Sequence, residues 1–142
     1  MAGLRYCDMA EIERGAIEHA LALQSDNACA RGFRAPATKT DGRSDRPDCV
    51  PEGALLRLDQ ALDVDALGLP PAQLAVARAF QRYGGYVVDV GGSPLSVSFE
   101  LVPDADGAYP GEVYRRAGLE WDYDRLEQIP WERLQLMEGH AR

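Results

Sequence analysis

Two side chains in the first third of the sequence have the chemistry for proton transfer. His19 lies in an apolar segment between Ile17 and Leu21, and its imidazole can gain or lose a proton near neutral pH. Asp41 lies in the sequence Thr-Asp-Gly at 40–42, which is typical of a tight turn. His19 and Asp41 are therefore the candidate catalytic residues, with the carboxylate aimed at His19 or at a sugar hydroxyl. The competing interpretations are a buried, hydrogen-bonded imidazole and an ordinary turn aspartate.

A second candidate site is the aromatic and acidic segment near the C-terminus. Trp121, Tyr123 and Trp131 occur close to three acidic residues, Glu120, Asp122 and Asp124. Aromatic planes beside carboxylates are suited to sugar rings, because the plane meets C–H groups while the carboxylates accept hydrogen bonds from hydroxyls. The three aromatic residues are therefore the candidate carbohydrate-binding residues. The alternative is that the two tryptophans anchor a terminal segment to the core.

The cysteines predict one disulfide bond and no metal site. Cys29 and Cys49 flank a segment rich in Gly, Pro, Asp, Arg and Ser, which has few apolar side chains with which to order itself. A disulfide closing this loop would remove about 3 kcal/mol of unfolded-state entropy and would place the protein in an oxidising compartment. Cys7 is then free or paired elsewhere. The alternative is three thiols in a cytosolic protein.

Several function classes are excluded or disfavoured by charge and motif content. The chain has 15 Lys and Arg against 23 Asp and Glu, a net charge of -8, which disfavours nucleic acids and anionic membrane surfaces. No apolar stretch approaches the length of a membrane-spanning helix. Cys-x-x-Cys pairs, nucleophile elbows and phosphate- or dinucleotide-binding loops are also absent, so we predict no metal and no cofactor.

Two helices have clear sequence signals. Asp8 and Glu11 have the spacing of a capping box and Gly15 supplies a stop, which predicts a short helix at Met9–Arg14. The best helix is expected at 71–83, because prolines precede it, Gly84 follows it and apolar side chains recur along one face. Shorter helical turns are expected at 59–67 and 111–117.

The remaining pattern predicts strands. The strongest signal is a hairpin formed by 86–90 and 95–101 around the sequence Gly-Gly-Ser-Pro. Weaker strands are expected at 16–24, where a short helix is the alternative, and at 33–38, 54–58 and 131–137. The fold class is therefore mainly β within α+β, with residues 1–142 as a single domain. We expect a β-sandwich or jelly-roll-like sheet with one amphipathic helix at 71–83 and short helical turns.

Five short sequences occur in a fixed order: GAIEHAL at 15–21, PATKTDG at 36–42, PEGA at 51–54, YGGYVVD at 83–89 and IPW at 129–131. Together they resemble the C-terminal half of a family of secreted bacterial and fungal proteins, most of which have no assigned function. The resemblance implies an extracellular location and a further, strand-rich N-terminal half. It implies no catalytic residues.

Two functions of different classes follow. The first is a secreted structural or interaction module that associates with itself or with a missing partner half. The alternative is a carbohydrate-binding or polysaccharide-degrading domain, a hydrolase or lyase, that uses His19 and Asp41. Neither function involves nucleic acid or insertion into a membrane.

Overall fold

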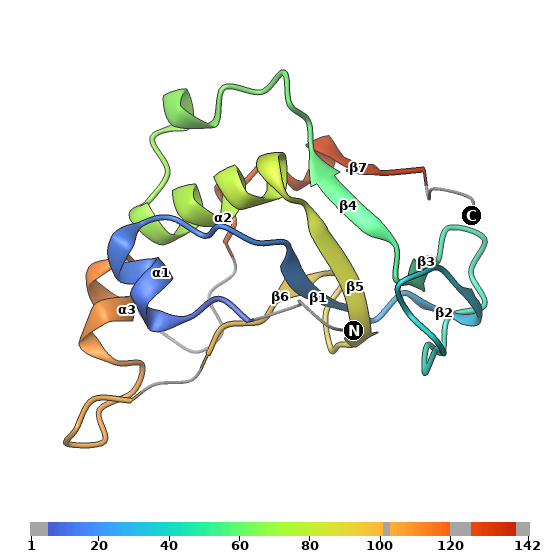
Figure 1. Ribbon diagram of the computed structural model, residues 1–142, viewed down its shortest axis with the longest axis horizontal. Coiled ribbons are helices and arrows are strands. Elements are labelled where there is room, and N and C mark those ends of the chain that lie inside the picture. Colours follow the sequence, from blue (N-terminus) through green and yellow to red (C-terminus); the bar gives the residue numbers. More distant parts are fainter. Residues whose placement is uncertain (1–5, 101–102, 120–125, 139–142) are drawn as a thin grey trace.

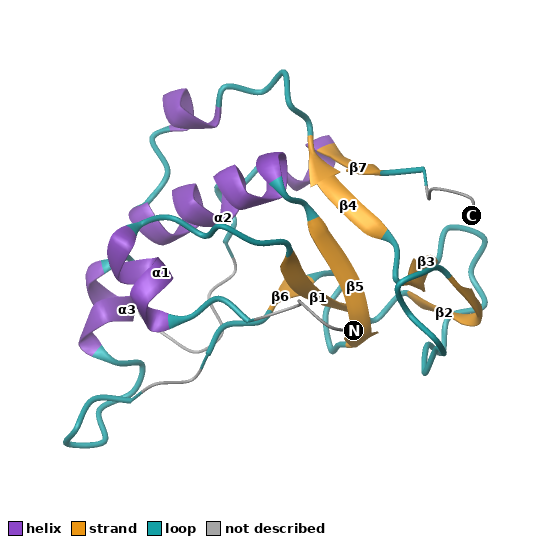
Figure 2. Ribbon diagram, in the orientation of Figure 1, coloured by secondary structure: helices purple, strands orange, loops and turns teal. Residues whose placement is uncertain are grey.

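The computed structural model describes residues 6–100, 103–119 and 126–138. Figures 1 and 2 show a twisted sheet backed by a long helix, with a smaller strand pair at one end. The elements in chain order are α1 (Met9–Arg14), β1 (Leu21–Ser25), β2 (Ala28–Phe33), β3 (Val50–Glu52), β4 (Leu55–Leu58), the 3-10 turn η1 (Val64–Leu67), α2 (Pro71–Arg82), β5 (Gly85–Val90), β6 (Ser96–Val97), α3 (Glu112–Arg116), the 3-10 turn η2 (Trp131–Arg133) and β7 (Leu134–Leu136).

The main sheet is mixed and has the strand order β6-β1-β5-β4-β7. β1 and β5 run parallel, whereas each of the other neighbouring pairs is antiparallel. β2 and β3 form a separate parallel pair, which the Cys29–Cys49 disulfide joins. The protein is therefore α+β and the predicted disulfide is confirmed. A sandwich or jelly-roll is not confirmed in the described residues.

Both predicted helices are confirmed, together with their caps. The Asp8 carboxylate accepts the N–H of Glu11 at 2.9 Å, and Glu11 accepts the N–H of Asp8 at 3.1 Å. Gly15 ends α1 with φ of 70°, a conformation that glycine adopts without strain. α2 ends at Arg82, one residue before the predicted end. The predicted turns at 59–67 and 111–117 contain η1 and α3.

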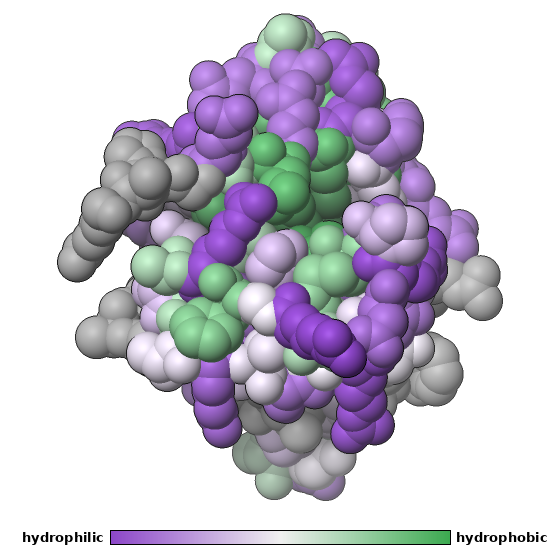
Figure 3. Space-filling model, turned by 90° about the vertical axis from the view of Figure 1, so that its right-hand side faces the viewer, coloured by the Kyte–Doolittle hydropathy of each residue, from purple (hydrophilic) through white to green (hydrophobic). Residues whose placement is uncertain are grey.

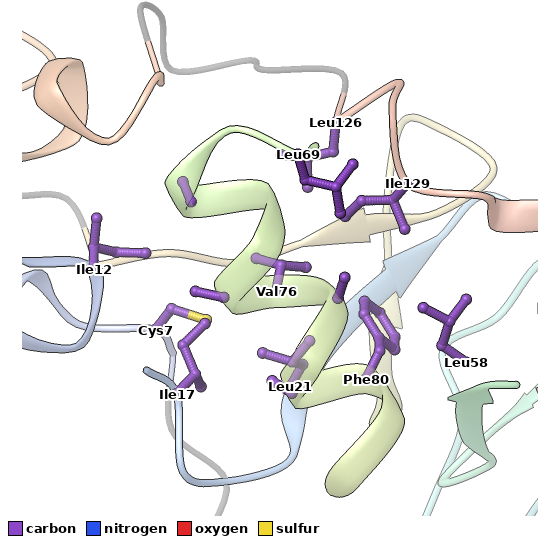
Figure 4. Packing of buried hydrophobic residues seen from close by; sticks show 14 of the residues in the cluster. Cys7, Ile12, Ile17, Leu21, Leu58, Leu69, Val76, Phe80, Leu126 and Ile129 are labelled. Carbon is purple, nitrogen blue, oxygen red and sulfur yellow. The ribbon is translucent and has the colours of Figure 1, made fainter. Parts of the chain in front are cut away.

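The core lies between α2 and one face of the main sheet (Figure 4). Val76 and Phe80 of α2 are fully buried, as are Leu21, Leu23 and Val87 of the sheet. These apolar side chains account for the position of the helix, because its other face carries polar residues.

The N-terminal segment closes one end of this core. Cys7 is buried, and burial raises the pKa of its thiol to about 12.

The predicted hairpin is wrong, although β5 and the two-residue β6 form where its two strands were expected. β5 and β6 do not pair with each other, because β1 lies between them. The connection crosses the end of β1, where Gly91 donates to the carbonyl of Ser25 at 3.2 Å and the Ser25 hydroxyl donates to the carbonyl of Pro94 at 2.7 Å. The predicted alternation is correct, since Val97 and Phe99 pack on the core. Alternation reports which face is buried but not which strand is the neighbour.

Two other predicted strands differ from the structure. The strand expected at 33–38 is wrong, because β2 ends at Phe33 and its neighbour Arg34 only donates one bond to the carbonyl of Glu52. The strand expected at 16–24 is correct only in its second half, because β1 begins at Leu21. His19 therefore lies in the segment that enters the sheet. The strands predicted at 54–58 and 131–137 contain β4 and β7.

Candidate functional site

His19 and Asp41 lie near opposite ends of the parallel β1–β5 pair. His19 comes two residues before Leu21, the first residue of β1. Asp41 interacts with Asp89, which pairs with Gln24 toward the other end of β1. Because a strand rises about 3.3 Å per residue, His19 and Asp41 are separated by on the order of 15 Å. The structure therefore does not bring them together as one acid–base pair.

The imidazole of His19 links α1 to the start of β1. Its Nδ1 lies 2.8 Å from the carbonyl oxygen of Ala20, and its Nε2 lies 3.0 Å from Oε2 of Glu11. The side chains of His19 and Glu11 are only 11% and 3% exposed. The pair is therefore a largely buried connection between the helix and the sheet.

Both ring nitrogens of His19 face oxygen atoms. Since a carbonyl oxygen can only accept, Nδ1 donates to Ala20, and Nε2 and the Glu11 carboxyl group hold one further proton between them. Neither nitrogen is left for a substrate, so this geometry favours the structural interpretation of His19, and a catalytic role stays a prediction. From the sequence, Glu11 was predicted only as a capping residue of the helix. Its contact with His19, eight positions later, depends on the tertiary fold.

Asp41 belongs to a carboxylate group with Glu52 and Asp89. The backbone N–H of Asp41 donates to Oε1 of Glu52 at 3.1 Å. The turn that carries Asp41 is held by Thr40, whose hydroxyl donates to the carbonyl of Cys29 at 2.9 Å and accepts the N–H of the residue after Asp41 at 3.0 Å. The backbone of Cys29 thus anchors the loop that supplies Asp41.

The pKa values of Glu52 and Asp41 are shifted in opposite directions. Glu52 is 5% exposed, and burial followed by the hydrogen bond with Asp41 raises its pKa. Hydrogen bonds to Glu52 and, less strongly, to Asp89 hold the pKa of Asp41 below its usual value. These opposite directions mean that Glu52 keeps its proton to a higher pH than Asp41 does.

Glu52 was not among the site residues predicted from the sequence. In the sequence it occurs only within PEGA at 51–54, one of the five short sequences that carry the resemblance. Its burial beside Asp41 depends on the pairing of β3 with β2, which joins segments far apart in the sequence.

The aromatic candidates are only partly covered by the described residues. Trp121 and Tyr123 lie outside them. Trp131 donates its indole N–H to the carbonyl of Leu126 at 3.0 Å and meets Phe80 edge-on, with ring centroids 5.5 Å apart. These contacts anchor Trp131 against the core, and the carbohydrate-binding role of the three residues stays a prediction.

The described surface is hollowed at a place away from these residues. It is an open depression of about 420 Å³ lined by Gln60, Val64, Asp65, Arg78, Gln81 and Arg82. Arg78 is paired with Asp65, and the Gln81 amide donates to the carbonyls of Asp59 and Leu62. Most of the polar side chains that line it therefore already form ion pairs or hydrogen bonds within the protein. Among residues 6–100, 103–119 and 126–138 there is no metal-binding group of three ligands and no helix able to cross a membrane.

An apolar patch lies at the end of the molecule where β7 and the β2–β3 pair meet, and Figure 3 shows hydrophobic side chains on this side with polar residues around them. Phe33 and Leu136 are 48% and 47% exposed, and Leu55 and Met137 are half-buried. Met137 donates to the carbonyl of Leu55 at 2.9 Å, and Arg34 donates to the carbonyl of Met137 at 3.3 Å, which connects the two regions. Leu136 pairs with the buried Leu56, so its side chain lies on the other face of the sheet from those of Leu55 and Met137. We use the name apolar end patch for Phe33, Leu55, Leu136 and Met137 together, although they do not share one face.

No protein family, curated protein or solved structure matches the chain.

Proposed function

We propose that the protein is a secreted interaction module that associates with itself through the end of the sheet that carries β7. The observation that carries this proposal is the position of β7 at the edge of the main sheet with Leu136 of the apolar end patch 47% exposed. An edge strand presents unpaired backbone groups to another strand, and an adjacent apolar patch supplies the burial that makes such pairing favourable.

The disulfide supports the extracellular part of the proposal. Cys29 and Cys49 are bonded, and such bonds persist mainly in oxidising compartments. The proposed location agrees with the secreted family that the sequence resembles. That resemblance also suggests a competing occupant for the same edge, a separate strand-rich partner half.

Light scattering coupled to size exclusion, run over a dilution series, tests self-association. We expect the mean mass to rise above the 15.5 kDa of one chain as the protein concentration increases through the micromolar range, and to fall on dilution. A single 15.5 kDa species at all concentrations, with a melting temperature independent of concentration, would contradict the proposal. If the protein is a monomer at all concentrations, the β7 edge is available to a different protein chain instead.

A second candidate function, polysaccharide hydrolysis, is favoured by the opposite pKa shifts of Asp41 and Glu52. A protonated Glu52 would donate to the leaving oxygen while an ionised Asp41 activates water, the division of roles that glycosidases use. The two carboxyl groups are in hydrogen-bond contact, closer than the roughly 5 Å or more typical of glycosidases, so substrate would have to separate them. Release of reducing sugar from polysaccharides, abolished by Glu52→Gln, is the corresponding assay.

A further inference from the structure

We propose that the occupant of the β7 edge is a second copy of β7, running antiparallel to the first and centred on Gln135. This inference rests on the proposed function, because it names the partner and the register of the same surface. The result would be a continuous sheet through two copies of the chain, related by a twofold axis that passes beside Gln135.

The backbone of β7 has one side engaged and one side turned outward. Met137 donates to the carbonyl of Leu55 at 2.9 Å, and Asp59 donates to the carbonyl of Arg133 at 3.0 Å. The odd-numbered residues of this segment therefore turn their backbone groups toward β4. Because these groups alternate in direction along a strand, Leu134 and Leu136 direct theirs away from β4.

This alternation fixes the register of self-pairing. In an antiparallel pair centred on Gln135, Leu136 faces the partner's Leu134 and donates its N–H to that carbonyl, and the twofold axis repeats the bond. The N–H of Leu134 is already used to cap η2 by donation to Trp131, so we infer two new backbone bonds rather than four. The two Gln135 residues form a non-hydrogen-bonded pair with Cα atoms about 4.5 Å apart.

The side chains of β7 are self-complementary in this register. The strand reads Leu-Gln-Leu, so its reversal brings leucine against leucine and amide against amide. A glutamine amide both donates and accepts, and two of them can bond each other across the axis. Within Leu134–Leu136 no charged side chain opposes the approach of a second copy, although each chain carries a net charge of -8.

The other edge of the sheet explains why such pairing would stop at two copies. At that edge the segment around Cys7 lies against the chain beyond β6, where Cys7 donates to the carbonyl of Ser98 at 3.3 Å and Glu100 donates to the carbonyl of Cys7 at 2.7 Å. The Cys7 segment thus continues the pairing beyond β6, whereas among the described residues no other segment bonds to the outward backbone groups of Leu136. Pairing of one edge with itself is an isologous contact, which closes as a dimer.

The expected dimer is weak. A three-residue strand pair buries far less than the roughly 1,200 Å² of stable interfaces, even with the apolar end patch beside it. We therefore expect a dissociation constant in roughly the micromolar range, and tighter association at higher salt because screening reduces the repulsion between two acidic chains.

Site-specific cross-linking tests the register. In the Gln135→Cys variant the two new thiols face each other across the axis at a separation that suits a disulfide, so mild oxidation should give a covalent dimer on a non-reducing gel. Gln60→Cys is the matched control, since Gln60 is also exposed but lies on the loop before η1, and it should give no covalent dimer although its non-covalent association is unchanged. Cys7 is buried and should not contribute.

A second pair of variants tests the same surface without introducing a thiol. Leu136→Lys should weaken dimerisation by about tenfold or more, as loss of an interface anchor does. Leu67→Lys replaces a comparably exposed leucine, 40% against 47%, away from β7, and should leave the dissociation constant unchanged. Far-UV circular dichroism and thermal melting confirm that both variants are folded.

The outcomes separate this inference from the proposed function. A dimer that neither cross-links through Cys at position 135 nor responds to Leu136→Lys overturns the β7 register while self-association stands. A monomer in every experiment overturns both. Cross-linking of Gln135→Cys together with selective weakening by Leu136→Lys supports both.

Discussion

The main sheet and the separate β2–β3 pair are stabilised in different ways. Where α2 covers the sheet, Val76, Phe80 and Leu21 are completely buried. At the β2–β3 pair the last three residues of β2 are exposed, and the segment is held by the Cys29–Cys49 bond. Hydrogen bonds such as that from the Ser44 hydroxyl to the Asn27 amide oxygen at 2.6 Å also contribute.

This difference explains where the candidate functional groups lie. A closely packed apolar core has no room for unpaired polar groups, whereas a covalently closed loop can carry charged side chains at little cost in packing. Asp41, Glu52 and Phe33 all lie in or beside the disulfide-bonded region. One end of the molecule thus supplies stability, and the other presents chemistry and apolar surface.

The largest contrast should come from the two phenylalanines. Phe80→Ala should lower the free energy of unfolding by about 3–5 kcal/mol, because it leaves a cavity in the core. Phe33→Ala should change it by less than about 0.5 kcal/mol, because Phe33 is exposed. Urea denaturation followed by circular dichroism measures both. Similar losses for the two variants would mean that the β2 end is packed as closely as the core.

Removal of the disulfide should have an intermediate effect. The bond joins cysteines separated by 20 positions, so the double variant Cys29→Ser/Cys49→Ser should lose about 3 kcal/mol. Hydrogen exchange should show amides of residues 28–53 opening first, while those of α2 keep most of their protection. Uniform loss of protection across the chain would contradict the division into two regions.

The sequence was informative where structure depends on nearby residues. The capping box of α1, the prolines and glycine around α2, and the alternation at Val97 and Phe99 are each read within a few positions, and all three predictions are confirmed. The disulfide was also predictable, because the intervening loop has too few apolar side chains to order itself.

Features that depend on pairing between distant segments were not predictable. β1 lies between β5 and β6, and a local hairpin signal contains no information about a strand some sixty residues earlier. The same limit applies to the candidate sites. The Glu11 partner of His19 and the Glu52 partner of Asp41 are placed by tertiary contacts, so sequence analysis identified one member of each pair only.

The smallest expected effect concerns Glu52 and depends on pH. Its pKa is raised, so the folded state is favoured by protonation of Glu52, and this stabilisation is lost as the pH rises through the folded-state pKa. Asp41 has a lowered pKa and contributes in the opposite sense, with a stabilisation that is lost on acidification. Glu52→Gln removes a buried charge at neutral pH, and its amide oxygen can still accept the N–H of Asp41.

We therefore expect Glu52→Gln to melt a few degrees above the wild type at pH 7, a shift worth roughly 1 kcal/mol, with the difference closing at acidic pH. Glu13→Gln is the control, because Glu13 is exposed on α1 and its substitution should not change the pH dependence. Thermal melts across the pH range measure both variants. If Glu52→Gln is less stable at pH 7 and recovers in acid, the ionised form of Glu52 is the stabilising one, and Glu52 cannot be the proton donor of a hydrolytic site.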